Sequence, residues 1–188
     1  MATAADRWAS EAAERPSQTH PLAIALQTGL PPRRARSDAI HFFTLLHAPA
    51  PAVPQRAADG APHDRWLAGF ATVFESERRW LADCAARSVA PRPDLALTRD
   101  ELALRQQRHA LLALASLERP GAALGAMVAL AADWRYLRRA LDGSEPAAFG
   151  APALIADRAV SFGMAQLAAI HRSIWDLVEA RQAARLSG

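Results

Sequence analysis

Two polar residues stand at positions where the helical repeat of apolar residues calls for an apolar one. In residues 63–87 the apolar positions recur at steps of four and three, and these steps reach Glu77. Near the end of the chain the same steps run from Leu167 to His171 and then to Ile174. We therefore expect an acid and an imidazole to point into the protein. A buried, unpaired carboxylate is strongly unfavourable, so Glu77 needs a basic partner, a metal ion or a shifted pKa.

Two interpretations of this pair are open. In the structural one, Glu77 and His171 bond to one another or to nearby arginines, and His171 is a hydrogen-bonded core histidine. In the functional one, both belong to a polar ligand pocket between helices. The candidate lining residues of that pocket are Glu77, His171, Trp80, His109 and Trp134.

The spacing of acids and histidines does not predict a metal centre or another cofactor. Di-metal sites in helical bundles use a Glu-x-x-His pair on each of two helices, and this spacing occurs nowhere in the sequence. His41 and His47 are six residues apart, which places them on different faces of a helix. The remaining candidate ligands mostly resemble cap, helix-end or flanking residues: Glu101, His109, Glu118 and Asp133.

Two other residues of reactive types are interpreted as packing residues. His47 follows Ile40 and Phe43 on one stripe, so we expect it to pack near a helix end. Cys84 is the single cysteine and lies among apolar positions, which is typical of a small buried hydrophobe. A reactive thiol is not indicated, because neither a helix N-terminus nor a histidine lies nearby in the sequence.

Known catalytic motifs are absent from the sequence. It has no glycine-rich phosphate-binding loop, and it lacks the HExxH, CxxC and GxSxG patterns. We therefore assign no catalytic residue, and the sequence does not indicate an enzyme.

The elements that position these residues are predicted to be helices. Ala and Leu dominate a hydrophobic fraction of 51%, whereas β-branched residues are few. The prediction is an all-α fold: an antiparallel helical bundle of four to five long helices with an irregular, short-helical N-terminal segment. A chain of 188 residues fits one domain. The long helices are expected at about residues 38–48, 63–87, 98–117, 121–142 and 152–185, with Thr98 and Glu101 as a capping box for the third.

The N-terminal third is expected to be less regular. Residues 1–36 hold two weak helix predictions, at 4–14 and 21–28, and a basic proline-rich connector that ends in Arg33, Arg34 and Arg36. The bundle itself is expected to span residues 37–188. Within it, residues 49–62 contain four prolines and are predicted to form a surface loop.

Charge and hydropathy argue against two classes of partner. All 22 basic residues are arginines, but the net charge is only +3, and the arginine clusters lack interleaved aromatic residues. We therefore expect no nucleic-acid binding. The longest apolar run, residues 121–132, is too short to span a membrane. The N-terminus lacks the apolar core of a signal peptide, and together with the lone cysteine this favours a cytoplasmic protein.

Small residues recur along one helix face. Gly121, Gly125 and Ala129 are spaced by four, as are Ala122 and Ala126. Such a face permits close helix approach, either inside the bundle or at a homodimer seam.

The functional expectation follows from abundant amphipathic helices without catalytic motifs. We expect a helical-bundle protein that acts through protein–protein contacts, as an adaptor or regulatory module, with a protein partner or as a homo-oligomer. The alternative is a small-ligand or metal-binding bundle with an internal Glu/His pocket.

Overall fold

The protein is all-α in a computed structural model that describes residues 15–29, 33–91, 93, 95–116, 120–150, 152 and 157–187. These residues form eight helices and no strand, which confirms the predicted fold class. The helices are α2 (Pro16–Thr19), α3 (Pro21–Gln27), α4 (Arg33–His47), α5 (Val53–Gly60), α6 (Arg65–Arg87), α7 (Leu95–Ser116), α8 (Pro120–Asp142) and α9 (Arg158–Leu186).

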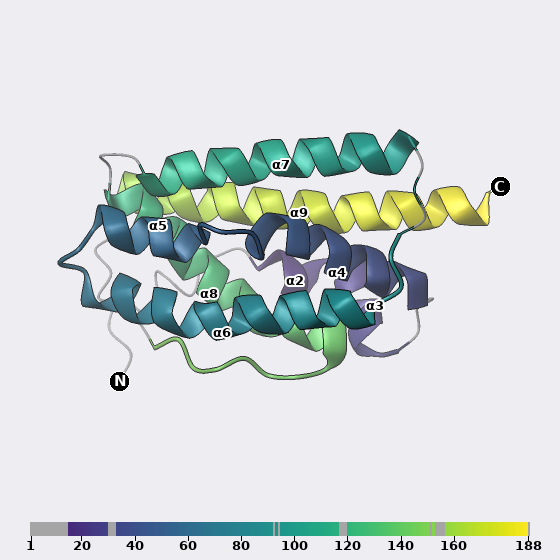
Figure 1. Cartoon of the computed structure of the whole chain (residues 1–188), viewed down its shortest axis with the longest axis horizontal. Helices are drawn as coiled ribbons and strands as arrows, with labels where there is room; N and C mark the ends of the chain where they lie inside the picture. The colour runs from purple at the N-terminus through teal and green to yellow at the C-terminus, as the bar shows by residue number, and fades with distance from the viewer. Residues whose placement is uncertain are drawn as a thin grey trace.

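Aromatic side chains fill the centre of the bundle. Helices α6, α7 and α9 follow the long dimension of the molecule, with α4 and α8 between them (Figure 1). Their inner faces bury six large rings: Phe42, Phe43, Phe70, Phe74, Trp134 and Trp175. Removing such rings from water is the main favourable term in folding.

Helix α6 shows how the sequence specifies one of these elements. The side chain of Asp64 accepts hydrogen bonds from the backbone N–H groups of Trp66 (2.9 Å) and Leu67 (3.0 Å), which caps the first turn. The apolar stripe, including Phe70 and Phe74, is buried. The helix predicted at 63–87 is thus confirmed, with its start two residues later at Arg65.

The small-residue face packs α8 against α9. A Cβ atom on Gly125 would lie 2.0 Å from the carbonyl oxygen of Val160, and one on Gly163 would lie 1.9 Å from that of Ala122. Neither distance is sterically allowed, so both glycines are needed for the observed approach. The small-residue face of α8 is therefore explained by packing inside the bundle. Gly163, the glycine of α9 that lies against this face, was not identified from the sequence.

Three long helices begin elsewhere than predicted. Helix α4 starts at Arg33, so the expected basic connector forms helical turns, consistent with the high helix propensity of Arg and Ala. Helix α7 starts at Leu95, which places Thr98 inside the helix and makes the capping box wrong. Helix α9 starts at Arg158, where the side chain of Asp157 accepts a hydrogen bond from the backbone N–H of Ala159 in the first turn, and not at Pro152.

The remaining predictions for the N-terminal third and the loop have mixed outcomes. The helix predicted at 21–28 is confirmed as α3, followed by Gly29 in a left-handed conformation with φ of 77°. The predicted loop at 49–62 contains the short helix α5. Pro54 does not prevent this helix, because it lies in the first turn, where proline is tolerated. The helix predicted at 4–14 lies outside the described residues.

Within the described part of the chain, none of the helices combines the length and the apolar character that crossing a bilayer requires.

Candidate functional site

Glu77 is a buried carboxylate whose partners come from the chain itself. Its side chain is 3% exposed. One oxygen, Oε2, accepts hydrogen bonds from Trp134 Nε1 (2.9 Å) and Arg138 Nη1 (2.8 Å). The other, Oε1, accepts one from the backbone N–H of Ala147 (3.1 Å). The arginine partner of the structural interpretation is therefore Arg138.

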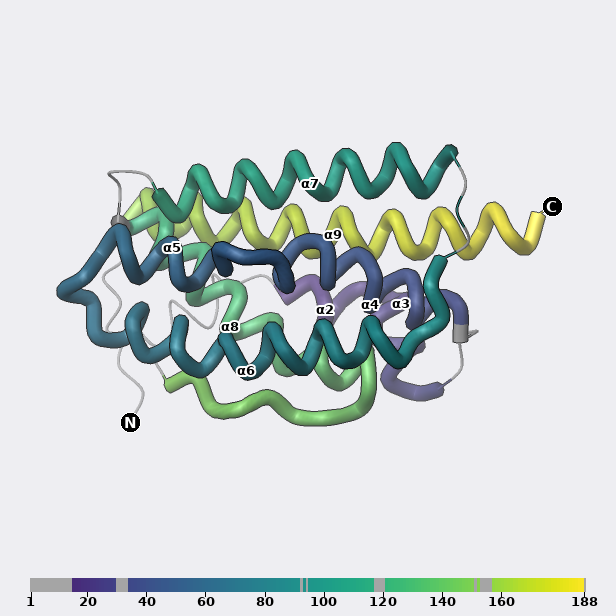
Figure 2. Tube along the Cα trace, viewed as in Figure 1, coloured from purple at the N-terminus to yellow at the C-terminus, as the bar shows by residue number. Residues whose placement is uncertain are grey.

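The Glu77 cluster fixes residues 143–150, which we call the return segment. This segment leaves the end of α8 and runs back along α6 and α8 (Figure 2). Arg138 donates to Ser144 Oγ from Nε (3.0 Å) and Nη2 (2.7 Å), and its guanidinium lies 4.1 Å from the ring centroid of Trp80. Glu77 then holds the same segment three residues later, at Ala147. A stretch without helix or strand is thus held in place by a buried ion pair.

His171 belongs to a second buried network. Its Nδ1 lies 2.8 Å from Asp133 Oδ2, and its Nε2 lies 2.9 Å from His47 Nε2. Because a carboxylate only accepts, Nδ1 of His171 carries a proton, and the two Nε2 atoms of His171 and His47 share one proton between them. His47 Nδ1 is a buried nitrogen without a hydrogen-bond partner among the described residues.

Burial keeps His47 neutral. Its desolvation lowers the pKa of His47 well below the ordinary value, and the neighbouring His171 and Arg108 lower it further. The rings of Phe43, Phe74 and Trp134 surround this imidazole.

Asp133 extends the second network to the N-terminal helices. Its carboxylate accepts from the backbone N–H of Ser17 (2.8 Å) and from Ser17 Oγ (2.6 Å). Ser17 Oγ in turn accepts from Trp175 Nε1 (3.0 Å). Helix α2 is thereby bonded to α8 and α9 at a fully buried position.

The structure separates some of the candidate pocket residues and brings others together. Glu77, Trp80 and Trp134 share one cluster. His171 lies beyond His47, whose ring is perpendicular to that of Trp134 at 5.3 Å. Glu77 and His171 each bond to other residues, so of the two alternatives, mutual pairing or pairing with arginine, Glu77 follows the second. His109 is exposed on α7 and borders a different hollow, beside Arg108 and Leu112.

Cys84 is a poorly activated thiol. It is 5% exposed, and burial raises its pKa, with Asp142 adding to the effect. Among the residues that the structure describes, no three His, Cys, Asp or Glu side chains come together as a metal-ligand group.

The two networks flank a cleft over the outer face of α8. The Glu77 network holds the return segment on one side, and the Asp133 network holds Arg15 and α2 on the other. The cleft has a volume of about 450 Å³ and is lined by Arg15, Trp66, Val128, Ala131, Ala132, Arg135, Glu145, Pro146, Ala147, Ala148, Phe149, Gly150 and Pro152.

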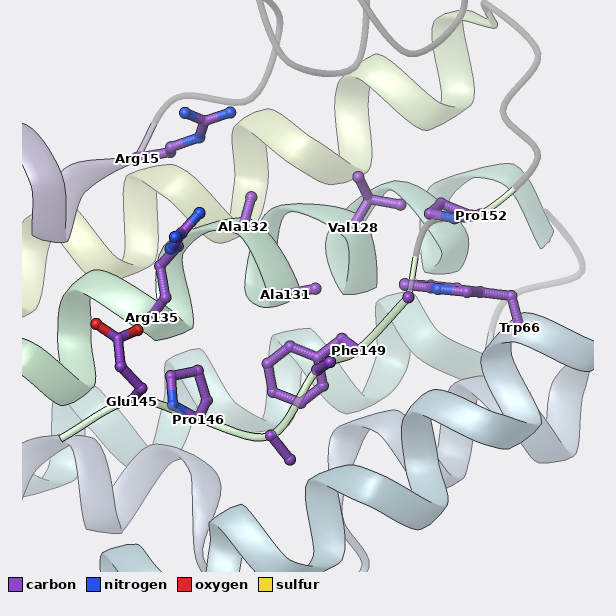
Figure 3. A pocket seen from close by; sticks show the side chains of 13 residues that line it. Arg15, Trp66, Val128, Ala131, Ala132, Arg135, Glu145, Pro146, Phe149 and Pro152 are labelled. Carbon is purple, nitrogen blue, oxygen red and sulfur yellow. The ribbon is translucent and has the colours of Figure 1, made fainter. Parts of the chain in front are cut away.

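The two ends of the cleft differ in chemistry (Figure 3). Arg15, Arg135 and Glu145 gather at one end, and Trp66 lies at the other, with Phe149 between them. Phe149 meets the ring of Phe70 edge-on at 4.9 Å, and Trp66 stacks on that same ring at 5.1 Å. The apolar wall is therefore built on the aromatic core.

Sequence reasoning set aside Asp133 and did not consider Ser17. Asp133 interrupts an apolar stripe between Leu130 and Leu137, which is the same signal that identified Glu77. Ser17 gave no such signal, because α2 has four residues and no repeat.

The comparisons with known proteins add a family and no further relatives. Residues 12–153 and 147–186 match the model of a family described as "Family of unknown function (DUF6975)". No curated protein matches the chain. No solved structure matches it either.

Proposed function

We propose that this chain, which belongs to the family of unknown function (DUF6975), binds a small organic ligand in the cleft over α8. The observation that carries the proposal is the aromatic wall of the cleft, formed by Trp66 and Phe149. The volume of about 450 Å³ lies within the range of roughly 300–1,000 Å³ that is usual for small-molecule sites.

Preorganisation of the walls supports the proposal. Both rings pack on Phe70, and Glu77 holds the backbone two residues before Phe149. A ligand then binds without ordering these groups itself, which favours affinity. In this proposal Glu77, Trp134 and Trp80 position the return segment, and His171 orients Asp133 under α2. None of the four contacts the ligand, and His109 has no part in binding.

A neutral fluorescent probe tests the proposal. N-phenylnaphthylamine is an apolar aromatic molecule whose emission rises on leaving water. We expect saturable binding to the wild type and its loss in Ala131→Trp, because Ala131 lines the cleft and an indole there fills it. Ala82→Trp is the matched control, since Ala82 is an exposed alanine of α6 outside the cleft. Equal binding by Ala131→Trp and the wild type would refute the proposal.

A second candidate function is contact with another protein. It is favoured by three large apolar side chains at one end of the bundle: Val89 (75% exposed), Leu95 (91%) and Leu186 (79%). The end of α6, the start of α7 and the end of α9 lie at this end (Figure 1). Exposed apolar side chains that gather in one place favour association.

Sedimentation velocity tests this second candidate in its simplest form, self-association. We expect the wild type to form a dimer in the micromolar range and the double variant Val89→Asp, Leu186→Asp to remain monomeric. A wild type that stays monomeric throughout that range would remove self-association through this end.

A further inference from the structure

We infer that the ligand of the α8 cleft is an organic anion, with an apolar body between Trp66 and Phe149 and an anionic group at Arg135 and Arg15. The inference rests on the proposed function and names the chemical class of its ligand. It is carried by the charges at one end of the cleft and by how they are paired.

Three arginines near the end of α8 have different surroundings. Arg138 pairs with Glu77, and Arg139 pairs with Glu145. Arg135 is exposed, lines the cleft, and forms no ion pair with a carboxylate among the residues that the structure describes. Its guanidinium contacts only the face of Tyr136, at 5.5 Å from the ring centroid, among those described contacts.

One end of the cleft therefore carries the positive charge of Arg135, which pairs with no carboxylate of the described residues. Among the described residues that line the cleft, Glu145 is the single carboxylate, and Arg139 neutralises it from outside the lining. Arg135 lies beside Glu145, and the side chain of Arg15 lies at the same end of the cleft. The bond from Ser17 to Asp133 places Arg15 there, because Arg15 lies two residues before Ser17.

The arrangement matches an amphipathic anion along its length. The polar end and the aromatic end lie at opposite ends of the same cleft (Figure 3). A guanidinium presents a planar set of donors that fits the paired oxygens of a carboxylate, a sulfonate or a phosphate. A neutral ligand of the same shape would leave Arg135 without an anionic partner among the described residues.

Two probes with one aromatic skeleton test the inference. Anilinonaphthalene sulfonate carries a sulfonate that N-phenylnaphthylamine lacks. Titrated against the full chain at low salt, the sulfonate is expected to bind about ten-fold more tightly, as charge-assisted contacts to partly exposed arginines allow. Arg135→Gln should reduce that preference about five-fold and leave the neutral probe unaffected, and added salt should weaken only the sulfonate.

The control for net charge is Arg79→Gln. Arg79 is an exposed residue of α6 outside the cleft, so its loss changes the net charge by the same amount without touching the site. Retention of the sulfonate preference in Arg79→Gln and its loss in Arg135→Gln support the inference.

The outcomes separate the inference from the proposed function. If both probes bind equally and Ala131→Trp abolishes both, the cleft binds ligands and the inferred anion class is wrong. The same conclusion follows if Arg135→Gln and Arg15→Gln each retain the sulfonate preference. If Ala131→Trp affects neither probe, the proposed function fails and the inference fails with it.

Discussion

Glu77 shows how one residue links the core to an irregular surface segment. The carboxylate binds two donors on α8 and a third, Ala147, in the return segment. Its inward position could be predicted, because it interrupts a strong apolar repeat. Its partner Ala147 could not, because it lies 70 residues away in a segment without any repeat, and a backbone N–H leaves no mark on the sequence.

Replacing Glu77 by Leu is expected to destabilise the protein by about 3 kcal/mol or more, because it leaves the guanidinium of Arg138 largely buried without its carboxylate. The matched control is Glu75→Leu, since Glu75 is a more exposed acid of α6 that pairs with Arg78, and its loss should cost about 1 kcal/mol or less. Urea unfolding measures both. Similar losses for the two variants would contradict the role assigned to Glu77.

His47 makes stability depend on pH. Its pKa is lowered in the folded protein, while in the unfolded chain it returns to about 6.5. Below that pH the unfolded chain binds the extra proton, so the free energy of unfolding falls, by up to about 1.4 kcal/mol per pH unit for this group. The loss ends once the pH passes the lowered pKa.

The variant His47→Gln retains a side-chain amide that can hydrogen-bond to His171 in either direction, and it removes this titration. Between about pH 6.5 and 5 we expect its free energy of unfolding to fall less steeply than that of the wild type. Urea unfolding at several pH values measures both slopes. Parallel slopes would show that His47 is not held neutral by the fold.

At the scale of elements, replacing glycine by alanine is expected to change stability in opposite directions inside and outside the α8–α9 contact. Gly125→Ala is expected to destabilise by about 3 kcal/mol, because its Cβ would collide with the carbonyl of Val160. Gly69→Ala, in α6, meets nothing within 4 Å and should stabilise by about 0.5–1 kcal/mol through helix propensity alone. Thermal unfolding compares the two, and the same sign for both would refute this description of the contact.

Ser17 bonds helix α2 to both α8 and α9. Replacing Ser17 by Ala removes one bond to Asp133 and leaves the buried N–H of Trp175 unpaired, at an expected cost of about 1–3 kcal/mol. Hydrogen exchange at residues 17–20 should accelerate. Thr19→Ala is the control, because Thr19 is exposed and bonds only within its own turn. Unchanged exchange in Ser17→Ala would mean that other contacts hold α2.

The success of sequence reasoning about elements followed the strength of their repeats. Helices α6 and α8 carry clear apolar stripes and were predicted closely. The starts of α4 and α7 were missed, because Arg-rich and Leu-Ala segments extend a helix without any stop signal. The predicted C-terminal end of α9 was accurate. Its start was placed too early, because both Pro152 and Asp157 are residue types that begin helices, and the helix begins after Asp157.

At the scale of the whole molecule, the cleft forms where four separate parts of the chain meet: Arg15, the start of α6, the outer face of α8 and the return segment. No local pattern marks such a place, because each part contributes only a few residues. The buried anchors that hold these parts were partly visible in the sequence as Glu77 and His171. The cleft that they frame was not.

The most direct test of this account is a nuclear magnetic resonance map of the bound sulfonate probe on isotope-labelled protein. The account predicts that saturating anilinonaphthalene sulfonate shifts the Trp66 indole N–H and the backbone signals of Ala131, Arg135 and Gly150, which line the cleft. Shifts confined to the exposed apolar residues at one end of the bundle, Val89, Leu95 and Leu186, or no shifts at all, would contradict it.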